Sequence, residues 1–140
     1  MASRPQKGVC ETMFLPRSFD HGKPDPFEYM PCTASTVYAL GMALKLVSGA
    51  LVKASGTDVP EYIAMEDKTA AAGDKLAVLR VSDDTVYETE LSVASASIAI
   101  GAKYTIDTTG GMITATTTSG VAEVVDFDGK AAGDKVRVRF

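Results

Sequence analysis

The residues that could carry chemistry in this chain are few and lie far apart. His21 is the only histidine, and it lies between Asp20 and Gly22 in a proline-rich segment. A catalytic triad requires a histidine that reaches both a nucleophile and an acid, so we interpret His21 as a solvated loop residue. Neither Cys10 nor Cys32 has the surrounding motif of a nucleophilic cysteine. We therefore predict that the chain has no catalytic residues and is not an enzyme.

The cysteines and acidic residues do not match a metal-binding pattern either. Two cysteines and one histidine are too few and too widely spaced for a zinc site. The pairs Asp83-Asp84 and Asp126/Asp128 offer carboxylates, but they lack the spacing of a calcium loop, and we interpret both as solvated turns. Because a secreted disulfide framework shows more cysteines, we predict free thiols in a reducing cytoplasm. No metal and no cofactor is expected.

Composition and motifs narrow the classes of partner. The chain has 140 residues and a formal net charge of −4, which argues for one domain and against nucleic acid, since phosphate binding needs a basic surface. A P-loop needs Gly-x-x-x-x-Gly-Lys-Ser/Thr, whereas Gly22-Lys23 precedes proline and Gly129-Lys130 precedes alanine. No signal peptide and no apolar run long enough to span a membrane is present. We expect a soluble chain without a membrane partner.

One short motif occurs twice and organises the second half of the chain. Ala71-Ala-Gly-Asp-Lys75 and Ala131-Ala-Gly-Asp-Lys135 are identical, and each precedes an apolar alternation typical of a strand. Glycine gives such a turn its backbone freedom, and aspartate favours turn hydrogen bonding. The segment 100–107 resembles a third, degenerate copy of this turn and strand.

Residues 1–35 differ from the rest and predict an extended N-terminal arm. Five of the six prolines lie here, which excludes a helix or a central strand. Two alternatives remain open: the arm lies on a partner, or it folds back and fills the edge of its own core. Stretched out, it could span up to about 115 Å. Aromatic side chains dominate binding hot spots, so the candidate anchors are Phe14, Phe19, Phe27 and Tyr29.

Residues 36–140 predict an all-β domain, either a small barrel or a sandwich. Short apolar runs separated by Gly-rich turns predict a hairpin at 37–53 around Ser48-Gly49, a strand at 61–65, a hairpin at 75–91, strands at 100–107 and 112–118 joined by a turn, and strands at 121–128 and 135–140. A helix at 37–47 is the alternative that Gly41 weighs against. The strand at 61–65 should place Tyr62 and Ala64 on one face and Ile63 and Met65 on the other.

Beyond these patterns, residues 36–140 resemble the head-decoration, or capsid cement, proteins of tailed bacteriophages. The likeness lies in Ser48-Gly49, in Pro60-Glu-Tyr-Ile-Ala-Met-Glu-Asp-Lys-Thr-Ala-Ala-Ala-Gly-Asp74 with the following Val78-Leu-Arg-Val81, in the run from Gly101 to Thr118, and in the closing Ala-Gly-Asp-Lys-Val-Arg-Val-Arg. The resemblance implies a structural virion protein, made in the bacterial cytoplasm, that binds the outer surface of the head. It further implies a homotrimer that bridges major capsid protein subunits against the pressure of packed DNA.

A second interpretation belongs to a different class of function. A small β-domain of this kind could instead bind carbohydrate or another host-surface ligand. Exposed aromatic side chains on the domain would favour this alternative, although tryptophan is absent and tyrosine is sparse.

Overall fold

A computed structural model describes residues 13–19 and 26–140, and these residues form an all-β protein, as the sequence predicts. Two five-stranded sheets and one two-stranded sheet account for its strands. The first sheet has the order β1-β9-β12-β11-β10, with the bounds β1 Leu15–Phe19, β9 Thr85–Glu90, β12 Lys135–Arg139, β11 Ala122–Phe127 and β10 Lys103–Tyr104. The second has the order β2-β8-β6-β4-β5, with the bounds β2 Glu28–Pro31, β8 Lys75–Arg80, β6 Tyr62–Ala64, β4 Ala43–Val47 and β5 Ala50–Lys53. The short pair is β3 Val37–Tyr38 with β7 Lys68–Thr69.

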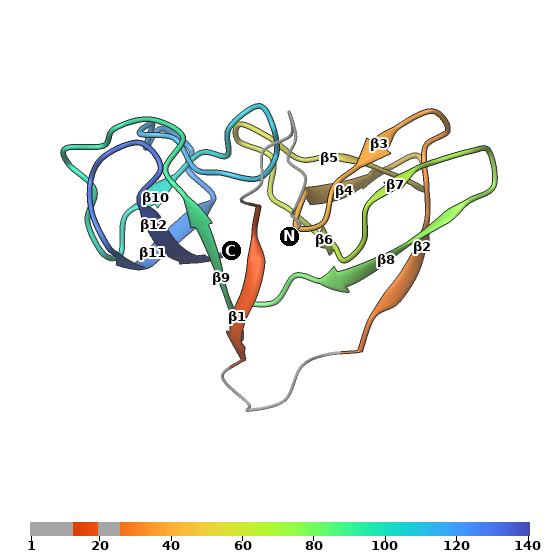
Figure 1. The fold of residues 1–140 in the computed structure, drawn as a ribbon, viewed down its shortest axis with the longest axis horizontal. Helices are drawn as coiled ribbons and strands as arrows, with labels where there is room; N and C mark the ends of the chain where they lie inside the picture. Colours follow the sequence, from red (N-terminus) through yellow and green to blue (C-terminus); the bar gives the residue numbers. More distant parts are fainter. Residues whose placement is uncertain (1–12, 20–25) are drawn as a thin grey trace, which may run out of the picture.

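The chain forms two units that lie side by side (Figure 1). The first unit contains β2 to β8, and the second contains β9 to β12 with β1 added beside β9. Neither five-stranded sheet closes into a barrel, and their packing is sandwich-like. In each unit one parallel bridge joins the residue that follows β2 or β9 to a segment distant in sequence, Cys32 to Leu51 and Leu91 to Ile113.

The two units are copies of one pattern, offset by 60 residues. Ala43 pairs with Ile63 and Leu44 with Tyr62, as Lys103 pairs with Glu123 and Tyr104 with Ala122. Equivalent main-chain hydrogen bonds run from Gly41 to Ala64 at 2.7 Å and from Gly101 to Val124 at 2.8 Å. The registers also relate β8 to β12 at an offset of 60 residues and β2 to β9 at an offset of 59. The repeated Ala-Ala-Gly-Asp-Lys motif is therefore the most visible part of a repeat that covers most of the fold.

The repeated turn has the same geometry in both places. Gly73 and Gly133 have φ angles of +85° and +90°, where a glycine is favoured. The Oδ2 atom of Asp74 accepts the N–H of Ala71 at 2.8 Å, and the corresponding carboxylate of Asp134 accepts from Ala131 at 2.9 Å. The sequence prediction of two equal turns that open two strands is confirmed.

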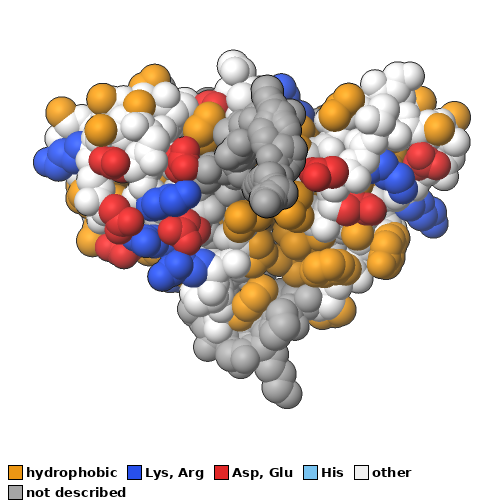
Figure 2. All heavy atoms as spheres, in the orientation of Figure 1, with side chains coloured by type: hydrophobic (Ala, Val, Ile, Leu, Met, Phe, Trp, Pro, Cys, Tyr) orange, Lys and Arg blue, Asp and Glu red, His pale blue; other side chains and the backbone are white. Residues whose placement is uncertain are grey.

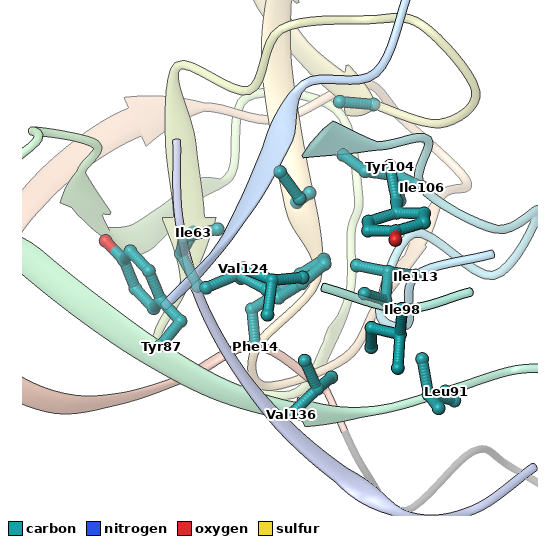
Figure 3. Close-up of a cluster of buried hydrophobic side chains, with 14 of the residues drawn as sticks. Phe14, Ile63, Tyr87, Leu91, Ile98, Tyr104, Ile106, Ile113, Val124 and Val136 are labelled. Atoms are coloured by element: carbon teal, nitrogen blue, oxygen red, sulfur yellow. The ribbon is translucent and has the colours of Figure 1, made fainter. Parts of the chain in front are cut away.

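Each unit has its own apolar core. The core of the first unit is built from Tyr38, Leu44, Leu51, Tyr62, Ala64, Ala70, Leu76 and Val78. The larger core lies in the second unit and continues onto the other face of the second sheet, the sheet of the first unit, through Ala43, Ile63 and Leu79 (Figure 3). Tyr62 and Ile63 thus serve different cores, so the predicted alternation of faces along β6 is confirmed. The predicted turn at Ser48-Gly49 is also confirmed, with β4 and β5 as the arms of the hairpin.

The predicted hairpin at 75–91 is wrong, because β8 and β9 belong to different sheets. The chain crosses from one unit to the other between Val81 and Asp84, and the N–H of Val81 is bonded to the carbonyl of Glu61 at 2.9 Å. Both runs are strands as expected. Their partners are β6 and β2 for β8, and β12 and β1 for β9.

Two further predictions for the second unit need correction. The segment 100–107 is the counterpart of 40–47 and not a third copy of the Gly73 turn, since Gly101 has φ +91° and repeats Gly41 at +89°. Residues 112–118 are not a continuous strand. Only Ile113 forms bridges, while the turn at 108–111 is organised by the carboxylate of Asp107, which accepts from Thr109 at 2.8 Å and from Met112 at 3.1 Å.

Candidate interaction surface

The four aromatic residues predicted as anchors fall into two groups. Phe14 directly precedes β1 and lies in the larger core, and Phe19 is the last residue of β1 and packs against that core. Phe27 directly precedes β2 and Tyr29 lies within it, and their side chains are 52% and 63% exposed. Both strands are edge strands, as the prolines of this segment require, with Pro16 in β1 and Pro31 in β2. The described part of the arm is thus paired with the sheets, and only its second aromatic pair faces solvent.

Phe14 is a core residue of its own chain. Its side chain is fully buried, and its ring meets that of Phe140 edge-on with 5.0 Å between centroids. The N–H of Phe14 donates to the carbonyl of Gly41 at 2.9 Å, which ties β1 to the first unit. The close-up shows Phe14 in the centre of the cluster, between residues of both units (Figure 3). Phe14 is therefore unavailable to a partner while β1 remains in place.

Phe27 and Tyr29 lie at the outer edge of the second sheet. Among the described residues, β2 pairs with β8 on one side and only Cys32 is bridged on the other. Hydrophobic side chains gather over this region of β2 and β8 in the space-filling view (Figure 2). Exposed aromatic side chains beside a strand edge are unusual on a monomer and mark interaction sites.

The edge is held in position by side chains on its inner side. Glu28 accepts two hydrogen bonds from Arg80, each at 2.8 Å. The guanidinium of Arg80 also lies over the Tyr62 ring, 5.1 Å from its centroid. The hydrogen bond to Glu28 raises the pKa of Arg80. Residues 27–29 are thus presented by an anchored strand.

The second unit carries charged side chains at the positions equivalent to Tyr29 and its neighbour on β8 in the first unit. Arg137 corresponds to Ala77, and its guanidinium contacts Glu88 at 3.4 Å, Asp126 at 3.2 Å and Asp128 at 2.6 Å. The hydrogen bond from Arg137 lowers the pKa of Asp128. The two aspartates predicted as solvated turn residues are therefore partners of an arginine. Arg17 of β1 contacts Glu88 at 2.9 Å and completes this network.

The sequence reasoning missed a second pair of exposed apolar residues. Leu40 and Ile100 occupy equivalent turns, just before Gly41 and Gly101, and are 43% and 66% exposed. The signal was present in the sequence as Ala39-Leu-Gly41 and Ala99-Ile-Gly101, but it is recognisable only once the 60-residue offset is known. An apolar residue exposed at the same place in both units is a candidate contact point.

Other candidate chemistry in the described residues is limited. No group of three or more His, Cys, Asp or Glu side chains could hold a metal ion within 13–19 and 26–140. Cys32 is a free, partly buried cysteine, and burial raises the pKa of its thiol. His21 and Cys10 lie outside the described residues. No helix long and apolar enough to cross a bilayer occurs in the part of the chain that the structure describes.

Comparison with known proteins gives no assignment. No protein-family model matches the chain, and no curated protein matches it at a significant level.

Proposed function

We propose that this chain is a structural protein of a tailed-bacteriophage virion, which binds the outer surface of the expanded head and bridges major capsid protein subunits. It acts by adhesion and without catalysis, and it is made in the bacterial cytoplasm before it joins the virion. A homotrimer is the form that the sequence resemblance implies. No nucleic acid and no membrane takes part.

The observation that carries this proposal is the repeated exposure of apolar side chains on an ordered β scaffold. Leu40 and Ile100 offer the same apolar turn twice, and Phe27 and Tyr29 add an aromatic pair on an edge strand. Several weak contacts from one rigid body add through effective concentration. A protein that holds neighbouring shell subunits together needs this arrangement, whereas an enzyme needs converging polar groups.

The test is co-sedimentation of the purified chain with expanded heads that lack it, from the phage that encodes it. We expect saturable binding by the parent and weaker binding by Leu40→Ser/Ile100→Ser. Val59→Ser is the matched control, because Val59 is an exposed apolar residue in a loop without a repeated counterpart. Truncation of residues 1–33 would not test the surface alone, since it also removes Phe14 from the core. Absence of binding by the parent would overturn the proposal.

The carbohydrate-binding alternative is favoured by one observation, the exposed rings of Phe27 and Tyr29. Aromatic faces can stack on sugars. Binding of the isolated chain to a glycan array, together with no association with heads, would favour this function instead.

A further inference from the structure

The internal repeat identifies a strand position that is filled in one unit and open in the other. In the second unit β1 pairs with the outer side of β9, with Leu15 opposite Glu88 and Ser18 opposite Val86. The registers with β12 and β8 make Glu88 equivalent to Tyr29 and Val86 equivalent to Phe27. In the first unit β5 approaches this side near the end of β2, through the bridge between Cys32 and Leu51, and no described strand pairs with residues 27–29 there.

The backbone of this open edge is oriented to pair with another strand. The N–H of Cys32 donates to the carbonyl of Asp74 at 2.9 Å, toward β8. Because main-chain groups alternate sides along a strand, those of Glu28 also point toward β8, and those of Phe27 and Tyr29 point outward. The second unit follows the same rule, since the N–H of Leu91 donates to Asp134 at 3.0 Å and Glu88 faces β1.

We propose that this edge pairs with the same edge of a second copy of the chain, as an antiparallel, two-fold β2–β2 contact centred on Glu28. In this register Phe27 of one copy lies opposite Tyr29 of the other, twice, so both aromatic pairs and both sets of outward main-chain groups are used. A register centred on Tyr29 would place Phe27 opposite Pro31, which has no N–H to donate.

The side chains favour a second copy over a strand like β1. In the second unit Arg17 of β1 meets a glutamate, Glu88, whereas the equivalent position in the first unit is the aromatic Tyr29. An aromatic residue opposite is therefore the better partner, and a second β2 supplies it. The two Glu28 carboxylates that meet at the two-fold axis are each neutralised by a bidentate Arg80. A contact this small is weak and reversible in solution, and it leaves the rest of each chain free for a three-fold contact.

The test uses the purified chain alone, so it does not depend on head binding. Sedimentation equilibrium up to the millimolar range should show an association step that Phe27→Ser/Tyr29→Ser abolishes and the control Val59→Ser leaves unchanged. Tyr29→Pro is a second variant. It removes the main-chain N–H of residue 29, which points away from β8, and leaves the hydrogen bonds between β2 and β8 intact. A parent without any association step, or one that persists in the Phe27→Ser/Tyr29→Ser variant, would overturn the proposal.

Covalent trapping checks the register. Residues in a pair without mutual hydrogen bonds lie about 4.5 Å apart at Cα, within disulfide range. Glu28→Cys should therefore form a disulfide-linked dimer on mild oxidation much faster than Val59→Cys. The rate of dimer formation by the parent, which has thiols of its own, is the background to subtract from both. Equal rates for the two variants would contradict the proposed pairing.

Discussion

Gly41 and Gly101 lie 60 residues apart and occupy the same place in the two units, with φ angles of +89° and +91°. Each donates its N–H to the equivalent carbonyl, of Ala64 or of Val124. They differ in one respect. A side chain on Gly101 would meet nothing within 4 Å, whereas one on Gly41 would collide with Met13 and lie 3.1 Å from the backbone of Phe14. In the first unit, therefore, the turn at Gly41 packs directly against Met13 and Phe14, the residues that lead into β1.

This pair predicts a matched result for two alanine substitutions. Gly101→Ala adds only the strain of a left-handed backbone, about 1–2 kcal/mol in the free energy of unfolding. Gly41→Ala carries the same strain and also displaces Met13 and Phe14, so we expect a clearly larger loss. Urea denaturation measures both. Equal losses would mean that β1 is not seated against Gly41.

Phe14→Ala should be among the most destabilising single substitutions in the chain. It empties a fully buried position beside Phe140, and such truncations typically cost about 3–5 kcal/mol. Leu15→Ala is the control, because Leu15 is next in sequence but exposed, and it should cost less than about 1 kcal/mol. Similar effects of the two in urea denaturation would contradict the position of Phe14 in the core.

The two repeated turns should respond equally to loss of their aspartates. Asp74→Ala and Asp134→Ala each remove one carboxylate acceptor for a turn N–H, and we expect each to lower the free energy of unfolding by about 1 kcal/mol. Asparagine at either position keeps an acceptor oxygen and should recover part of the loss. Thermal unfolding of the four variants checks whether the turns are equivalent in energy as well as in geometry.

Stability should fall at acidic pH because of two partly exposed ion pairs. Hydrogen bonds lower the pKa of Asp58, chiefly from Lys45 at 3.0 Å, and of Asp128, chiefly from Arg137 at 2.6 Å. A carboxylate with a lowered pKa in the folded state contributes stability above its unfolded value, about 3.9, and that stability disappears as pH falls through the folded pKa.

The measurement is urea denaturation across this pH range. The decline in stability below about pH 4 should be smaller in Asp128→Asn than in the parent, and Asp83→Asn, in an exposed turn, is the control. An unchanged decline in Asp128→Asn would show that the contact with Arg137 contributes nothing to the pH dependence.

Most strands were predictable from local pattern, but their partners were not. Alternation from Leu76 to Val78 and the glycine turns locate β8 and β12 well. The same alternation continues after Asp84, so nothing local separates a hairpin from a crossover between sheets. The wrong hairpin at 75–91 arose there, because strand pairing depends on contacts distant in sequence.

Only part of the candidate surface could be predicted, because the burial of each aromatic residue also depends on contacts distant in sequence. Proline content correctly excluded β1 and β2 from helices and central strands, since proline cannot donate within a ladder. Composition could not tell that Phe14 enters the core while Tyr29 stays outside, because both are aromatic residues among prolines. The difference depends on Gly41 leaving room for Met13 and Phe14, which only the structure shows.

The most direct test of the proposed function is the location of this chain in purified phage particles. Mass spectrometry of mature virions, combined with cryo-imaging of their heads, should find many copies per particle, on the outer surface and in contact with the major capsid protein. Absence of the chain from virions, or density for it only inside the head, would contradict the proposal.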